Sequence, residues 1–232
     1  MAWLRYVLYF LGVALLTWML TQIEISFPGS LKLHEFVGPG AGHGTSEYSP
    51  VEIIQLLILG VCGALMGWVA MNCPSQRPLA IGFGGLALVF LIRELDFFFD
   101  RYLIENLWPV LIAVAAAFLI VYTHRHRRRL TIALARIWPS PGLALLFAGA
   151  AILFAFVHLV GNELLWQSIL GDAYEPTVTT AVEEFVELIG YMLWLIGTIE
   201  YVYQAKAIAM HEPRPAAQRL RQRRRERGDG AY

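Results

Sequence analysis

The sequence has few charged residues, and this shortage excludes an ordinary soluble domain. Charged residues make up 16% of the 232 residues, while hydrophobic residues make up 57% and the mean hydropathy is +0.55. About a quarter of the residues of a soluble domain are charged. The charges here are also bunched between long apolar runs, which is typical of a protein embedded in a lipid bilayer.

Cysteine, lysine and histidine are scarce, and familiar catalytic motifs are missing. The two cysteines, Cys62 and Cys73, form no CxxC motif, and the chain has no GxSxG, HExxH or P-loop pattern. A bis-histidine haem needs paired histidines on helices, but His158 is the only histidine within an apolar run. A retinal Schiff base needs a buried lysine, and the only lysines are Lys32 and Lys206. We therefore expect neither haem nor retinal as a cofactor.

Six apolar runs are present, and each is close to the roughly 20 residues that cross about 30 Å of hydrocarbon as a helix. They lie near residues 3–22, 50–71, 79–98, 107–122, 143–162 and 181–203. They are too continuous for the alternating strands of a membrane barrel. The sequence therefore predicts an all-α integral membrane protein, with a six-helix transmembrane domain over residues 1–205 and an outer loop over 23–49. Residues 206–232 are expected to form a basic, disordered tail.

The distribution of charge predicts the orientation of these helices. If six helices alternate in direction, 15 of the 18 basic residues lie on one side, and most of them fall in segments 125–136 and 206–227. The positive-inside rule places that side in the cytoplasm. We therefore expect a multi-pass protein of the cell (inner) membrane with both termini cytoplasmic. On the same assignment, 14 of the 18 acidic residues fall in the outer half.

Ionisable residues within the predicted helices mark the candidate site, because such residues are costly in a membrane and usually functional. They are Glu94, Asp96 and Asp100 of the third helix, His158 and Glu163 of the fifth, and Glu183 and Glu187 of the sixth. All lie toward the outer face, where a bundle can bring them into one pocket. Our first hypothesis is a protein that binds or translocates a cation there. Carboxylates with an imidazole suit zinc, manganese or iron, carboxylates with backbone oxygens suit calcium, and the same set can carry protons.

Some of these residues also have a structural interpretation. Segments Ser49–Glu52 and Thr180–Glu183 both read as capping boxes, which makes Glu52 and Glu183 more typical of helix caps than of ligands. Within the third helix, Arg93 is expected to pair with Asp96, and Glu94 with Arg101. No cap or pair of this kind accounts for Glu187 or His158.

Two further hypotheses come from other classes of protein. The chain could be a metal-dependent hydrolase that acts on a lipid or amphiphile from the outer face, with His34 and His43 of the outer loop completing the metal ligands. It could instead be a non-catalytic accessory or scaffold subunit of a larger membrane complex, in which the acids only cap and pair. The hydrolase hypothesis predicts that His34 or His43 lies within metal-coordination distance of His158. The accessory-subunit hypothesis predicts an outer half without a cavity, in which every acid is paired.

The arginines between the fourth and fifth helices predict lipid as a partner. Basic residues beside a membrane contact anionic head groups, each worth about 1 kcal/mol near the surface. The expected contacts are Arg125, Arg127, Arg128 and Arg129. Nucleic acid is a disfavoured partner, because arginine runs next to membrane helices already have a role in orienting them. Glu200, near the inner end of the sixth helix, is expected at the membrane interface close to Lys206.

Overall fold

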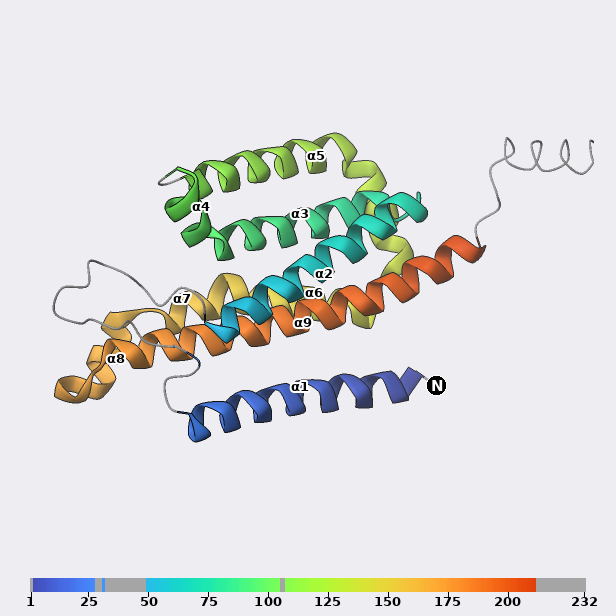
Figure 1. The fold of residues 1–232 in the computed structure, drawn as a ribbon. Helices are drawn as coiled ribbons and strands as arrows, with labels where there is room; N and C mark the ends of the chain where they lie inside the picture. Colours follow the sequence, from blue (N-terminus) through green and yellow to red (C-terminus); the bar gives the residue numbers. More distant parts are fainter. Residues whose placement is uncertain (1, 28–30, 32–48, 105–106, 212–232) are drawn as a thin grey trace, which may run out of the picture.

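The computed structural model describes residues 2–27, 31, 49–104 and 107–211, and this part of the chain is helical, without a β-strand. The elements are α1 Ala2–Ser26, α2 Pro50–Asn72, α3 Arg77–Glu94, α4 Asp96–Tyr102, α5 Leu107–Ile137, α6 Pro141–Ala151, the π-helix η1 Ile152–Phe156, α7 Val157–Val160, α8 Glu163–Leu170, the 3-10 helix η2 Gly171–Ala173 and α9 Pro176–His211 (Figure 1). The predicted all-α class is confirmed.

Five helical segments of the described chain are long and apolar enough to cross a membrane. They are Trp3–Ser26, Pro50–Asn72, Leu107–Ile137, Pro141–Val160 and Val178–His211. The third predicted span corresponds to α3, which has 18 residues and carries Arg77, Arg93 and Glu94 at its ends. The structure therefore supports a membrane protein with five such helices. The predicted count of six requires α3 to cross the membrane as well.

The long helices run in alternating directions from α1 through α2, α3, α5 and α6 to α9, so the bundle has two distinct ends (Figure 1). The start of α1 and the end of α9 lie at the same end, together with the α2–α3 and α5–α6 turns. We call this the basic end, because it carries Arg5, Arg77, Arg136 and Lys206. The opposite end holds α4, α7 and α8, and we call it the acidic end after Glu52, Glu94 and Glu187.

Helix α9 forms the centre of the bundle, and it packs very closely against α6. A Cβ atom added to Gly142 of α6 would lie 2.8 Å from the backbone N of Tyr201, and one added to Gly149 would lie 2.9 Å from the carbonyl oxygen of Gly190. Small residues at such contacts let two membrane helices approach until their backbones touch. This contact holds α9 firmly at the centre, where it contributes residues to both ends of the molecule.

Two helices extend well beyond their apolar runs. Helix α5 continues past the predicted limit of 122 to Ile137, and the four arginines assigned to a loop lie on it with exposed side chains. Helix α9 begins at Pro176 rather than near 181 and continues into the segment assigned to the tail, as far as His211. Arginine and lysine are good helix formers, so the end of an apolar run does not mark the end of the helix.

Two other predicted helices are interrupted. The predicted helix 79–98 ends at Glu94, and Leu95, with φ −99° and ψ 10°, separates α3 from α4. Arg93 and Asp96, which were expected to pair within one helix, therefore lie on different helices. The predicted helix 143–162 corresponds to α6, η1 and α7, and Asn162 then caps a separate helix, α8, that begins at Glu163.

Candidate functional site

A hollow of about 250 Å³ lies at the acidic end, between α2, α3, α4 and α9. We call it the acidic pocket. Its lining residues carry six carboxyl groups and one guanidinium: Glu52, Arg93, Glu94, Asp96, Glu183, Glu184 and Glu187. The carboxyl groups come from four helices, so the pocket exists only because the fold brings distant acidic residues together.

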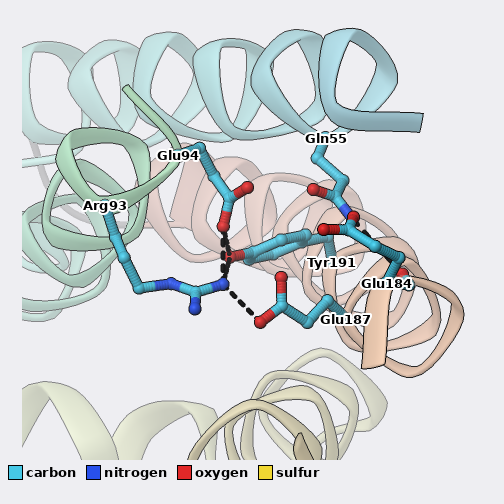
Figure 2. Close-up of polar contacts among 6 residues, drawn as sticks. All are labelled: Gln55, Arg93, Glu94, Glu184, Glu187 and Tyr191. Atoms are coloured by element: carbon cyan, nitrogen blue, oxygen red, sulfur yellow. Dashed lines mark hydrogen bonds and ion pairs between the residues drawn. The ribbon is translucent and has the colours of Figure 1, made fainter. Parts of the chain in front are cut away.

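Arg93 organises the wall formed by α3 and α9 (Figure 2). Its Nη2 lies 2.7 Å from Oε1 of Glu94 and 2.5 Å from Oε1 of Glu187. The hydroxyl of Tyr191, one turn below Glu187 on α9, donates a hydrogen bond of 2.6 Å to the same oxygen of Glu94. The carboxylates of Glu94 and Glu187 are only 7% and 5% exposed. The guanidinium of Arg93 thus pairs with two buried carboxylates and links α3 to α9 at the wall of the pocket.

A second contact joins α2 to α9 on the far side of the pocket (Figure 2). The Nε2 of Gln55 donates to the Oε2 of Glu184 at 3.1 Å and to the backbone carbonyl of Glu184 at 3.3 Å. Gln55 is fully buried. A neutral amide orients the Glu184 carboxyl group but brings no positive charge to this side of the pocket.

Glu52 and Glu183 differ in how well the capping interpretation describes them. The Ser49–Glu52 capping box is confirmed: the backbone N–H of Glu52 donates to Oγ of Ser49 at 3.0 Å, and the backbone N–H of Ser49 donates to Oε2 of Glu52 at 3.2 Å. The second capping box is wrong, because α9 begins at Pro176, about two turns before Glu183. Glu183 is instead a residue of the helix interior whose carboxylate faces the pocket.

Three predicted site residues do not line the acidic pocket: His158, Glu163 and Asp100. All three side chains are exposed, on α7, α8 and α4 respectively. His158 still interacts electrostatically with Glu183 across the end of α7. Of the seven predicted residues, the fold therefore brings together Glu94, Asp96, Glu183 and Glu187.

The described chain offers no ready-made metal centre. Within it, no group of three or more histidine, cysteine, aspartate or glutamate side chains is placed to hold a metal ion. The predicted ligand set around His158 is therefore unsupported. His34 and His43 lie outside the described residues, so their distance from His158 stays a prediction.

Sequence reasoning missed the central role of Arg93 and did not include Glu52, Glu184, Gln55 or Tyr191 in the site. A local signal was available for α9, because Glu184, Glu187 and Tyr191 follow one another at helical spacings of three and four residues. Nothing local marked Arg93 as the partner of Glu187, since the two residues are on different helices and nearly a hundred positions apart.

A second polar cluster lies at the basic end and involves Glu200 of α9. Its carboxylate accepts hydrogen bonds from Nη2 of Arg5 at 3.3 Å, from the hydroxyl of Tyr6 at 3.4 Å and from the hydroxyl of Tyr9 at 2.9 Å. We call these four residues the Glu200 cluster. Glu200 was expected at the membrane interface close to Lys206; in the fold it is buried, and its carboxylate is bonded to α1.

The chain matches no protein-family model, no curated protein and no solved structure. Its function therefore has to be inferred from the geometry and charge of its own pockets.

Proposed function

We propose that this is a six-span protein of the cell (inner) membrane that binds a cation from the outer side in the acidic pocket. The observation that carries the proposal is the charge imbalance of a hollow site: six carboxyl groups and one guanidinium surround about 250 Å³. Like charges gathered at low dielectric repel one another. A cation that enters the hollow relieves this repulsion, so the arrangement of the carboxyl groups favours cation binding.

The packing of α3 supports the sixth crossing. Helix α3 lies beside both α2 and α5, antiparallel to each (Figure 1). Its 18 residues span about 27 Å at 1.5 Å per residue, close to the hydrocarbon thickness of about 30 Å. Six alternating crossings place the basic end in the cytoplasm by the positive-inside rule, and the acidic pocket then opens toward the outer face.

The size of the pocket favours a hydrated cation over a bare metal ion. One water molecule occupies about 30 Å³ of liquid, so the hollow has room for an ion together with several waters. Carboxylate oxygens are the ligands of hard cations such as calcium and magnesium, and magnesium keeps much of its water shell when bound. We therefore propose a hard divalent cation held largely through its waters, which does not require a compact group of protein ligands.

The core below the pocket supports binding rather than passage of an ion. Aromatic rings of α3 and α9 stack edge to face through the centre of the bundle, with centroid distances between 5.7 and 6.1 Å. The rings belong to Phe83, Phe90, Tyr191, Trp194 and Tyr201. Closely packed rings oppose the passage of an ion with its water shell, so we propose a site that is open at one end only.

The other hypotheses have less support. An accessory subunit whose acids only cap and pair is expected to have a filled outer half, which differs from a hollow of about 250 Å³ lined by six carboxyl groups. A hydrolase needs His34 and His43 beside His158, and both loop histidines lie outside the described residues. Cation binding is therefore the function that we carry forward.

The test is to measure cation-dependent thermal unfolding of the protein in phosphatidylcholine nanodiscs. A ligand that binds only the folded state raises its stability, so calcium or magnesium should raise the unfolding temperature of wild type. Glu187→Gln and Glu184→Gln should each remove most of this shift. Glu163→Gln is the matched control, because Glu163 is an exposed acid of the same end that does not line the pocket. The proposal fails if no cation shifts wild type, or if both pocket variants respond as wild type does.

A further inference from the structure

A second hollow, of about 570 Å³, runs along α3 between α2 and α5. We call it the α3 groove. Its lining is apolar, and small residues such as Gly63, Gly67 and Ala70 of α2 and Gly84 of α3 leave the space open. Apolar side chains at its edge, including Val114 at 64% exposed, project outward from α5. In a membrane, this groove faces lipid rather than water.

The groove has the length of one lipid chain. On α3 its lining extends from Ala80 to Ile92, which is about 18 Å at 1.5 Å per residue. Half of the hydrocarbon thickness is about 15 Å. The groove begins near the basic end and ends at Ile92, beside Arg93 of the acidic pocket, so it spans the leaflet on that side and continues into the other leaflet.

A pair of arginines lies at the basic end of the groove. The Nε of Arg77 donates a hydrogen bond of 2.7 Å to the carbonyl oxygen of Ala70, a residue of the groove wall. On α5, the ring of Tyr122 stacks on Phe118, another wall residue, with centroids 5.9 Å apart. Both Arg77 and Arg129 interact electrostatically with Tyr122. Arg77 is thus held at the groove wall, and Arg129, seven residues after Tyr122 on α5, lies on the same face of that helix. Both guanidinium groups are exposed.

We infer that the α3 groove binds one anionic phospholipid, with an acyl chain along α3 and the head-group phosphate between Arg77 and Arg129. Guanidinium groups match phosphate oxygens in geometry and charge, and basic residues at the cytoplasmic surface attract anionic lipids. A second protein helix in the groove would use its apolar wall but leave the two arginines without a matching charge. The lipid site is separate from the acidic pocket and does not depend on its function.

The general attraction of arginines for lipid does not account for this arrangement. Arg127 and Arg128 of α5 are also exposed, but they lie off the helix face that carries Phe118 and Tyr122, so they should attract anionic lipids in a diffuse way. Arg77 and Arg129 differ because Arg77 donates a hydrogen bond to Ala70 of the groove wall and Arg129 lies on the same α5 face as Phe118 and Tyr122. This difference provides the control for the experiment.

The experiment is native mass spectrometry of the full chain, extracted in mild detergent and exposed to phosphatidylglycerol or phosphatidylcholine with identical acyl chains. Wild type should retain one phosphatidylglycerol and prefer it by about thirtyfold, since each basic residue near the surface contributes about fivefold to binding an anionic lipid. The double variant Arg77→Gln/Arg129→Gln should lose this preference, whereas Arg127→Gln/Arg128→Gln should keep it.

A second pair of variants tests the groove itself. A Cβ at Gly67 meets no atom within 4 Å, so Gly67→Leu should fold normally, fill the groove and abolish lipid retention. Gly60→Leu is the matched control on the same helix, because its Cβ also meets open space and Gly60 does not line the groove. Equal retention of both lipids by wild type, or lipid retention by Gly67→Leu, would overturn the inference. So would a wild-type dimer that Gly67→Leu dissociates, because the occupant would then be a second copy of the chain.

Discussion

Helix α9 carries one buried carboxylate toward the acidic end, Glu187, and one toward the basic end, Glu200. The two carboxylates differ in their surroundings. At the basic end, Glu200 alone accepts hydrogen bonds from one guanidinium and two phenols. At the acidic end, one guanidinium pairs with two carboxylates, and four more carboxyl groups line the same hollow. A charge within a membrane helix is therefore not by itself a sign of function. Our proposal for the acidic end depends on carboxyl groups gathered around an open space, which the Glu200 cluster does not have.

The largest effect on stability is expected from Arg93→Met. The substitution leaves the buried carboxylates of Glu94 and Glu187 without their guanidinium, and breaking a buried ion pair in this way costs about 3–5 kcal/mol. Equilibrium unfolding in detergent micelles measures the loss. In Arg93→Met/Glu187→Gln the loss should be smaller than in the single variant. If Arg93→Met unfolds as wild type does, Arg93 does not organise the acidic end.

Glu200→Gln should destabilise the protein less, by about 1.5–3 kcal/mol, the typical value of a hydrogen bond to a charged group. The variant weakens the attachment of α1 to α9 at the opposite end from the pocket. Cross-linking between cysteines introduced at exposed positions of α1 and α9 reports on that attachment. Cation-induced stabilisation should be unchanged in this variant, and its disappearance would show that the two ends are not independent.

Two glycine-to-alanine substitutions test how well each end of the bundle accommodates an added Cβ atom. A Cβ in Gly142→Ala meets the backbone N of Tyr201 at 2.8 Å, beside Glu200, and such overpacking costs about 1–3 kcal/mol. A Cβ in Gly161→Ala meets the carboxylate of Glu183 at 2.7 Å, but that side chain can turn into the hollow. Thermal unfolding of the two variants should therefore show a clear loss for Gly142→Ala and almost none for Gly161→Ala. Equal losses would indicate that the acidic end is as rigid as the basic end.

The smallest expected change in the free energy of unfolding is a gain rather than a loss. Without added cation, Glu184→Gln should stabilise the protein by about 0.5–2 kcal/mol, as often happens when a strained functional group is replaced. The amide can still accept the hydrogen bond from Gln55, and one fewer carboxyl group is crowded around the hollow. The measurement is the unfolding midpoint in the presence of a chelator. A destabilised variant would place Glu184 in the same structural class as Glu200.

The sequence was sufficient to predict the helical class and part of the site, because both depend on local patterns. Long apolar runs define the helices, and Glu94 and Glu187 stand out as acids within such runs. The Ser49–Glu52 cap is also a local motif and was predicted correctly. The break at Leu95 was not predictable, because no glycine or proline marks it, and α3 and α4 are separated by a single non-helical residue.

What the sequence could not reveal depends on contacts between distant residues. Arg93 lies beside Asp96 in the sequence, yet in the fold it contacts Glu187 of another helix. Glu200 was assigned to Lys206, a neighbour within two turns, while its partners lie on α1. His158 was placed in the site because it is a rare intramembrane histidine, but its position on α7 leaves it exposed at the edge.

The Glu200 cluster also has a consequence for the order in which the protein is made. Its partners on α1 precede Glu200 by 191–195 positions, so a ribosome completes α1 long before it reaches the carboxylate that receives it. Most side chains of α1 are exposed, and until then this helix has few other contacts to hold it in place. The hydrogen bonds to Glu200 thus form only when the chain is nearly complete. In a nascent protein that stops short of α9, the first helix remains undocked.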